Sequence, residues 1–282
     1  MQLLTNWQTQ FCNKWQLPHD YIEGVNPALD WFKSTISEVP FPLSIAISGC
    51  QGSGKSTLSA YFVEYLKSQG VSAEAVSLDD FYLSKHSRQA LARRLHPEFE
   101  TRGAPGTHNI KAACSVVERF KRKQAFVLPR FDKSTDDPFS EDKWTEVKKP
   151  IDVLIFEGWC LGLPAQPETL LTSTCNQFEL LHDQDGSYRK AVNEFLAGDY
   201  QSLFCQFDKL LFLNGQSFEH VFNWRLEQEN KLITKTGRGM SAQQVSKFIQ
   251  SYQRLTEWGI NQLPNLCDFE VTLDSHRKTA IR

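Results

Sequence analysis

Residues 43–56 read Leu-Ser-Ile-Ala-Ile-Ser-Gly-Cys-Gln-Gly-Ser-Gly-Lys-Ser. The opening residues are mostly apolar and β-branched, which predicts a buried strand. The glycines and the closing Lys55-Ser56 pair fit the pattern G-x-x-x-x-G-K-[ST] at every fixed position, and a segment with helical periodicity follows. A glycine-rich loop between a strand and a helix lets backbone N–H groups surround an anion. We therefore predict a phosphate-binding loop here rather than a chance glycine-rich turn.

The residue types in this loop also predict what each would do. The ammonium group of Lys55 would reach the β- and γ-phosphates of a nucleoside triphosphate, and the hydroxyl of Ser56 would bind Mg²⁺. Loop N–H groups could lower the pKa of Cys50, but a small residue that fits the loop is the simpler interpretation. Nucleotide binding is assigned to the whole loop, namely Gly49, Cys50, Gln51, Gly52, Ser53, Gly54, Lys55, Ser56 and Thr57.

The composition is that of a folded globular protein without a strong charge bias. The chain has 282 residues, of which 40% are hydrophobic, and its 31 basic and 33 acidic residues give a formal net charge of -2. This length suffices for one large domain with a substantial core. Because there is no basic excess, we predict no binding to nucleic acid or to a membrane surface. A nucleotide site needs positive charge only locally.

The seven cysteines are odd in number and include no C-x-x-C pair. This pattern disfavours a disulfide framework and a zinc site, and it favours a reducing compartment. The N-terminus has no basic segment followed by an apolar one, and no later stretch is long and apolar enough to span a bilayer. We therefore expect a cytoplasmic protein, and we expect it to be a monomer.

Acidic residues follow two of the other predicted strands. Apolar runs predict these strands at residues 73–78, 151–156, 210–213 and 269–273. Asp79 and Asp80 come directly after the first run, and Glu157 follows the second. In an open parallel sheet, ligands bind beyond the carboxyl ends of the strands. We therefore expect the phosphate-binding loop and these acids to meet at one edge of the sheet.

These acids would have different roles in phosphoryl transfer. Glu157 would hold Mg²⁺, directly or through water, because carboxylate oxygens are preferred ligands of this ion. Asp79 would orient an attacking hydroxyl group and accept its proton, and Asp80 is the alternative base. Acids at strand ends also cap helices and turns. A purely structural role therefore stays open for each of them, and most of all for Asp80.

Cationic side chains follow in the later loops. Arg102 lies in a loop shaped by Gly103, Pro105 and Gly106, and would bind an anionic substrate. Arg225 and Arg238 flank a predicted break between two late helices, a place for a mobile lid, and Arg225 would supply charge to the transition state. Weaker candidates for substrate binding are His108, Arg130, Asp132 and Lys133.

The patterns along the chain predict an α/β fold, with a parallel sheet and helices on both faces. Aromatic residues at helical spacing predict a helical extension over residues 1–40, ahead of a phosphate-loop domain over 41–282. Residues 161–204 have an interrupted helical pattern and would form an insertion. The lid would span residues 224–241, and Ser241 with Gln244 would form a capping box for the last helix.

With these segments in view, the chain resembles the D-glycerate 3-kinase family of P-loop kinases, which is related to pantothenate kinase, uridine kinase and phosphoribulokinase. The resemblance covers most of residues 43–280. Beyond the loop it rests on Ser-Leu-Asp-Asp-Phe-Tyr-Leu (77–83), Arg-Gly-Ala-Pro-Gly-Thr-His (102–108), Pro-Arg-Phe-Asp-Lys-Ser (129–134) and Phe-Glu-Gly-Trp-Cys-Leu-Gly (156–162). Later matches are Trp-Arg-Leu-Glu-Gln-Glu (224–229) and Leu-Asp-Ser-His-Arg (273–277).

The resemblance implies a P-loop kinase fold and ATP-dependent phosphorylation of D-glycerate to 3-phosphoglycerate with Mg²⁺. In the wider group the pattern Asp-x-Phe-Tyr carries the catalytic acid, which falls on Asp79, and Tyr82 would lie at the substrate. The resemblance also implies an adenine pocket near Ser275, with His276 and Arg277 at the nucleotide. A small hydroxy acid would then lie between Asp79 and Arg102.

Other functions stay open at this point. Within the same class, the acceptor would be another small molecule, such as pantothenate or a nucleoside. A non-catalytic ATP-binding regulator would keep the phosphate-binding loop but would have little use for Asp79 or Glu157. A GTPase would need an N-K-x-D motif; Asn230-Lys231 is followed by Leu-Ile, which disfavours this class.

Overall fold

The fold is built on a parallel sheet, seen in a computed structural model that describes residues 4–237 and 239–280. Among these residues the sheet has six strands in the order β10-β9-β8-β1-β7-β2. The neighbouring pairs from β9 to β2 are parallel, and β10 runs antiparallel to β9. The bounds are β1 Leu43–Gly49, β2 Ala73–Ser77, β7 Val153–Gly158, β8 Lys209–Asn214, β9 Phe269–Leu273 and β10 Thr279–Ala280. The predicted parallel strands are all confirmed.

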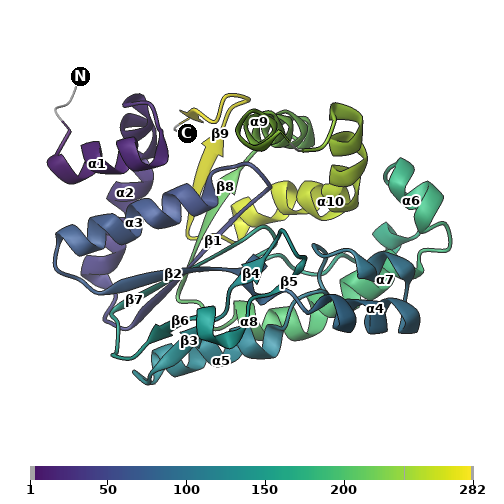
Figure 1. The fold of residues 1–282 in the computed structure, drawn as a ribbon, viewed down its shortest axis with the longest axis horizontal. Coiled ribbons are helices and arrows are strands. Elements are labelled where there is room, and N and C mark those ends of the chain that lie inside the picture. Colours follow the sequence, from purple (N-terminus) through teal and green to yellow (C-terminus); the bar gives the residue numbers. More distant parts are fainter. Residues whose placement is uncertain (1–3, 238, 281–282) are drawn as a thin grey trace.

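Side chains that alternate along β1 point into two different cores. Leu43, Ile45 and Ile47 are buried in one apolar cluster with residues of the first three helices and of α9 (Phe218–Thr236). Ala46 belongs to the second cluster, with residues of α5 (Ile110–Lys121), α8 (Gln201–Phe204) and α10 (Ala242–Gln262). Figure 1 shows α3 (Lys55–Ser68) on one side of the sheet and α5 with α8 on the other. This arrangement confirms the predicted α/β fold with helices on both faces.

The helices have the following bounds. They are α1 Asn6–Trp15, α2 Asp20–Glu38, α3 Lys55–Ser68, α4 Lys85–Arg94, α5 Ile110–Lys121, α6 Gln177–His182, α7 Ser187–Phe195, α8 Gln201–Phe204, α9 Phe218–Thr236 and α10 Ala242–Gln262. Helices α6, α7 and α8 lie in the segment expected to form an insertion. The capping box at the start of α10 is present, with Ser241 accepting from the backbone of Gln244 and the Gln244 side chain accepting from that of Ser241.

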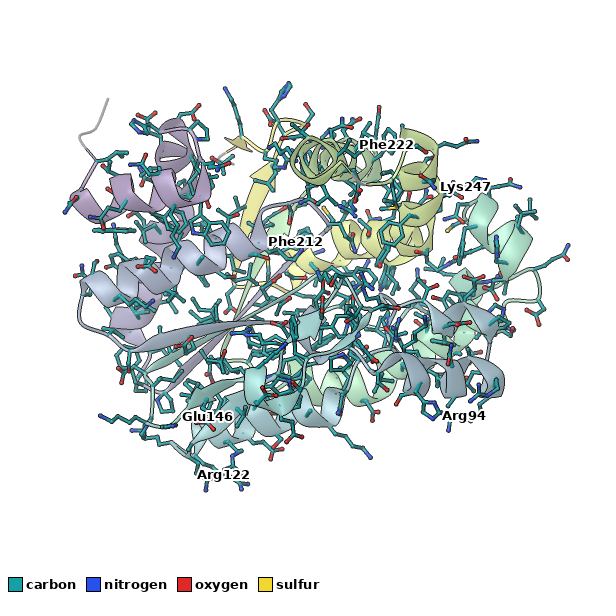
Figure 2. The ribbon with its side chains drawn as sticks, viewed as in Figure 1. Arg94, Arg122, Glu146, Phe212, Phe222 and Lys247 are labelled. Carbon is teal, nitrogen blue, oxygen red and sulfur yellow. The ribbon has the colours of Figure 1, made fainter. Side chains whose placement is uncertain are left out.

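Helices α1 and α2 are joined to α3 by aromatic contacts. The rings of Phe32 and Phe62 are stacked with centroids 4.2 Å apart, and Trp7 packs against Tyr61 at 5.1 Å. Phe32 and Phe62 are fully buried. The aromatic residues at helical spacing between Trp7 and Phe32 therefore pack mainly onto the core, as predicted. Figure 2 shows Phe212 of β8 within the molecule and Arg122, which follows α5, at its outer edge.

Two small antiparallel pairs lie beside the main sheet. They are β3 Phe126–Leu128 with β6 Thr145–Val147, and β4 Phe131–Asp132 with β5 Asp137–Pro138. The second pair places the Pro129–Ser134 motif beside the segment that follows β2, since the Phe131 backbone N–H donates to Asp80 Oδ1 at 3.2 Å.

No helix within residues 4–237 and 239–280 is both long and apolar enough to cross a membrane. The seven cysteines all lie in the described part of the chain, and all are free thiols.

Candidate active site

The phosphate-binding loop runs from the end of β1 to the start of α3. Gly52 and Gly54 have φ values of 81° and 93°, which favour glycine because it has no Cβ. A Cβ on Gly52 would lie 2.7 Å from Cβ of Trp224, so the loop is packed against α9. A Cβ on Gly54 would meet no atom within 4 Å. There is therefore open space beside the N-cap of the 14-residue helix α3, whose N-terminus carries partial positive charge.

Lys55 and Ser56 make defined contacts at this helix start. Lys55 Nζ donates to the Cys50 carbonyl oxygen at 3.0 Å, and Ser56 Oγ donates to Glu157 Oε1 at 2.8 Å. Glu157 is only 8% exposed and pairs across the sheet with Ile47 of β1. The hydroxyl and the carboxylate assigned to Mg²⁺ are therefore in direct contact.

Cys50 is buried within the loop. Burial raises the pKa of its thiol to about 11, although the positive charge of Lys55 acts in the opposite direction. The thiol is therefore protonated at neutral pH. A backbone hydrogen bond in the loop does act to lower this pKa, as suggested, but burial outweighs it. The simpler interpretation, a small residue that fits the loop, agrees with the structure.

Asp79 and Asp80 follow β2 in a short 3₁₀ turn, Leu78–Phe81. Asp79 Oδ2 accepts from Lys133 Nζ at 2.7 Å, and its Oδ1 accepts from the Tyr82 hydroxyl at 3.0 Å. Asp80 Oδ2 accepts from Arg130 Nη1 at 2.9 Å, and its Oδ1 accepts from the backbone of residue 131. Asp80 thus anchors the loop that carries Arg130, whereas the Asp79 carboxylate accepts only from side chains within the described part of the chain.

A cavity of about 460 Å³ connects these groups. Its wall includes Lys55 and Ser56 from the loop, Asp79 from the end of β2, and Glu157 from the end of β7. Because β1, β7 and β2 are neighbours and parallel, their carboxyl ends lie at one edge of the sheet. The expected meeting of the loop and the distant acids is therefore present in the structure.

A larger and more apolar cavity of about 750 Å³ lies between α5 and the β3–β6 pair. It shares Asp80 and Tyr82 with the smaller cavity but is not lined by the phosphate-binding loop or by Glu157. The smaller cavity is the candidate active site because it alone of the two combines an anion-binding loop with carboxylates.

Three cationic side chains outside the loop line the site. Arg102 forms an ion pair with Asp136 and its guanidinium lies 5.5 Å from the ring centroid of Phe131. Lys133 is paired with Asp79, as described above, and Arg225 forms an ion pair with Glu229. Arg225 lies in the second turn of α9, so the expectation that it flanks the break before α10 is wrong. The helix begins at Phe218 and continues without interruption to Thr236.

Other predicted residues do not line this cavity. His108 is buried behind Tyr82, with the two rings stacked at 4.3 Å. Arg130 is paired with Asp80, and Asp132 accepts hydrogen bonds within its own turn from Ser134. His276 is exposed, whereas Arg277 donates to the Gly52 carbonyl oxygen at 2.7 Å and so contacts the phosphate-binding loop. Arg238 lies outside the described residues.

Sequence reasoning missed the aromatic side of the cavity. Trp159 and Tyr252 pack edge to face at 5.0 Å, and Trp159 Nε1 donates to the Gly103 carbonyl oxygen at 3.0 Å. Tyr252 comes from α10, where it falls on the buried face and looks like ordinary core. Other lining residues without a prediction are Ser77, Gly158, Gln228 and Phe248.

Comparison with known proteins agrees with this site. Residues 44–163 match the phosphoribulokinase / uridine kinase family. The chain is 32% identical over 250 residues to the uncharacterized kinase mug58 of Schizosaccharomyces pombe, covering 84% of this chain and 89% of that protein. It is 29% identical over 261 residues to the chloroplastic D-glycerate 3-kinase of Arabidopsis thaliana, covering 85% of this chain and 53% of that protein.

A solved structure is also similar over nearly the whole chain. It is the D-glycerate 3-kinase of Cryptococcus neoformans, with 25% identity, a TM-score of 0.73, and coverage of 93% of this chain and 97% of that one. The match to the family spans nearly all of β1, the phosphate-binding loop, Asp79 and Glu157, and so includes the loop and both acids of the cavity wall. The chain therefore belongs to the phosphoribulokinase / uridine kinase family of P-loop kinases.

Proposed function

We propose that this kinase transfers the γ-phosphoryl group of ATP to the primary hydroxyl of D-glycerate, giving 3-phosphoglycerate and ADP. The observation that carries the proposal is the single cavity lined by Lys55, Asp79 and Arg102. A hydroxy-acid kinase needs a group that binds the phosphates, a base that accepts the proton of the hydroxyl, and a cation that binds the carboxylate. The similarity to two proteins named D-glycerate 3-kinase supports this acceptor.

The nucleotide side of the cavity fits ATP with Mg²⁺. Lys55 and the N-terminus of α3 would hold the phosphates, and Ser56 and Glu157 offer two adjacent oxygen ligands for the ion. Among the described residues, no group of three or more His, Cys, Asp or Glu could hold a metal by itself. This suits Mg²⁺, which usually takes most of its ligands from phosphate and water. When bound, the ion would neutralise charge on the phosphates.

We place the adenine near the segment after β9. Trp224 Nε1 donates to the Ser275 carbonyl oxygen at 2.7 Å, and the Arg277 guanidinium lies 5.5 Å from the Trp224 ring centroid. Arg277 also contacts Gly52 of the phosphate-binding loop. Since this segment is fixed against the loop, it lies within reach of a nucleotide whose phosphates occupy the loop.

In the proposed reaction, the hydroxyl oxygen of the acceptor forms a bond to the γ-phosphorus and its proton passes to Asp79. The bond from the γ-phosphorus to the β–γ bridging oxygen breaks, and ADP leaves with that electron pair. Burial alone would raise the pKa of Asp79, but the charge and hydrogen bond of Lys133, with the hydrogen bond of Tyr82, outweigh burial and lower it. The carboxylate is therefore ionised at neutral pH and can accept the proton.

Arg225 would act on the transferred phosphoryl group. Its guanidinium lines the cavity and lies 5.7 Å from the ring centroid of Phe248 in α10, while Glu229 pairs with it from the next turn of α9. An arginine held in this way can stabilise charge that develops on the phosphoryl oxygens. We further propose that the enzyme is a monomer in the cytoplasm, where its free thiols would remain reduced.

A coupled ADP-release assay tests the acceptor directly. The panel contains D-glycerate, L-glycerate, glycerol, pantothenate and uridine, each with ATP and Mg²⁺, and the product is identified by NMR. We expect saturable turnover with D-glycerate and phosphate on its primary hydroxyl. Saturable turnover with pantothenate or uridine and none with D-glycerate would overturn the proposed acceptor but keep the kinase. ATP binding without turnover of any acceptor would favour a regulator.

A further inference from the structure

Arg88 of α4 is a buried cation with an unusually complete set of partners. Its side chain has 0% exposure. Nε donates to the Leu83 carbonyl oxygen at 3.2 Å, Nη1 to that of Glu100 at 3.0 Å, and Nη2 to that of Asp136 at 2.8 Å. Nη2 also forms an ion pair with Asp136 Oδ2 at 2.8 Å. Burial of a charge is costly unless it is paired and hydrogen-bonded, and here both conditions are met.

The partners of Arg88 lie in three separate segments, and each segment carries a residue of the active-site wall. Leu83 follows Tyr82, Glu100 precedes Arg102 by two positions, and Asp136 lies in the turn after Lys133. Tyr82, Arg102 and Lys133 all line the cavity. Arg88 therefore fixes the relative positions of the loops that form the acceptor side.

Asp136 connects Arg88 to the substrate-facing arginine. Its Oδ2 pairs with Arg88, and its Oδ1 pairs with Arg102 Nη1. Burial would raise the pKa of Asp136, but the hydrogen bonds and charges of the two arginines outweigh it and lower the pKa, so the carboxylate is ionised. One carboxylate thus joins a buried guanidinium to one that faces the cavity.

The other edge of the Arg102 guanidinium has no protein partner among the described residues. Within residues 4–237 and 239–280, Nη1 forms the only hydrogen bond of this side chain, and the ring of Phe131 lies beside the guanidinium. Nε and Nη2 are adjacent donors on one side of the planar group, and this pair matches the two oxygens of a carboxylate. The cavity is therefore lined by a guanidinium that is fixed at one edge and available at the other.

We propose that Arg88 and Asp136 are positioning residues that hold Arg102 so that its Nε–Nη2 edge binds the carboxylate of a short hydroxy acid. Asp79 lines the same cavity and would receive the proton of the acceptor hydroxyl. Binding the carboxylate at Arg102 would therefore decide which hydroxyl reaches Asp79. This inference rests on the proposed function, and it adds the selection of acids over neutral alcohols.

Two substitutions of Asp136 test this role without straining the backbone. Asp136 has a φ of 60°, which asparagine and glycine tolerate better than other residues. Asp136→Asn removes the charge that pairs with both Arg88 and Arg102. Asp136→Gly removes both side-chain contacts and keeps only the backbone carbonyl that accepts from Arg88. We expect KM for D-glycerate to rise about tenfold in the first variant and further in the second, since charge-assisted hydrogen bonds are about twice as strong as neutral ones. KM for ATP and kcat should change less than about twofold.

Asp137→Asn is the matched control. It removes the same charge from the adjacent position, but the Asp137 carboxylate accepts from the Lys85 backbone N–H at 2.9 Å and does not contact Arg102. KM for D-glycerate should stay at the value of the unmodified enzyme. Glycerol, which has no carboxylate, should be a poor acceptor for the unmodified enzyme. In the Asp136 variants, the ratio of kcat/KM for D-glycerate to kcat/KM for glycerol should be smaller.

Several results would overturn the inference. One is an unchanged KM for D-glycerate in both Asp136 variants. Another is a parallel loss in kcat and in KM for ATP, which would show that Asp136 only stabilises the fold. If the unmodified enzyme phosphorylates a different hydroxy acid, the D-glycerate assignment fails, and the same KM ratio with that acid decides the role of Asp136. An acceptor without a carboxylate would overturn both proposals.

Discussion

Asp79 and Asp80 are adjacent in the sequence, but their carboxylates have different partners. Asp80 is bound by Arg130 and by a backbone N–H, which fix a loop. Asp79 is bound by Lys133 and Tyr82, which are themselves in the cavity wall. The sequence could not separate the two acids because both follow the same strand. The partners favour Asp79 as the base and give Asp80 a structural role.

His108 shows how burial sets the charge of a residue near the site. Its Nδ1 lies 2.5 Å from the Tyr200 hydroxyl, which accepts from the Gly106 backbone N–H. Burial lowers the pKa of His108 to about 4, against a weaker opposing effect of Asp79.

This low pKa predicts a loss of stability at mildly acidic pH. Between the ordinary histidine pKa of 6.5 and the folded value of about 4, the unfolded chain binds a proton that the folded chain does not. The contribution of His108 to the free energy of unfolding is therefore fully present above pH 6.5. It decreases as the pH falls from 6.5 towards 4. We expect His108 to account for a loss of about 2 kcal/mol in the free energy of unfolding between pH 7 and pH 5.

Urea denaturation at the two pH values measures this effect. His108→Gln should have a smaller difference between pH 7 and pH 5 than the unmodified protein, whatever its absolute stability. His86→Gln, which removes an exposed histidine, is the control and should keep the full difference. Equal pH dependence in His108→Gln and the unmodified protein would contradict a buried, neutral His108.

Helix α4 was not predicted, because its buried face has no stripe of apolar residues. Only Arg88 and Leu91 of this helix are buried, so the sequence reads as a basic, solvated segment. Its anchoring role depends on carbonyl groups and a carboxylate that lie up to 48 positions away in sequence. The strands of the β3–β6 and β4–β5 pairs are only two or three residues long. They are too short to show the alternation of apolar and polar residues that predicts a strand.

The packing of α2 against α3 gives a prediction for stability. Phe32 is fully buried and stacks on Phe62, so Phe32→Ala would leave a cavity between the two helices. We expect the free energy of unfolding to fall by about 3–5 kcal/mol. Leu181→Ala is the control, because Leu181 is 68% exposed, and it should change stability by less than about 0.5 kcal/mol. A loss below about 1 kcal/mol in Phe32→Ala would mean that the helical extension is only loosely attached.

For the whole molecule, the sequence predicted the parts that depend on local pattern and on the rules of parallel sheets. The strand ends, the phosphate-binding loop and the meeting of Lys55 with Asp79 and Glu157 all follow from that reasoning. The aromatic wall from Trp159 and Tyr252 could not be predicted, because it depends on where α10 packs. The same holds for Arg88 and Asp136, whose contacts bring three distant segments together.

The proposed reaction requires this edge of the sheet to be one reaction centre, in which Asp79 takes the proton of the acceptor. The most direct test measures turnover with D-glycerate and ATP binding in Asp79→Asn, with Asp80→Asn as the matched variant. We predict that kcat of Asp79→Asn falls by about 100-fold or more, while its Kd for ATP stays within about twofold and Asp80→Asn loses less activity. Turnover by Asp79→Asn within about threefold of the unmodified enzyme would contradict the assignment of Asp79 as the base.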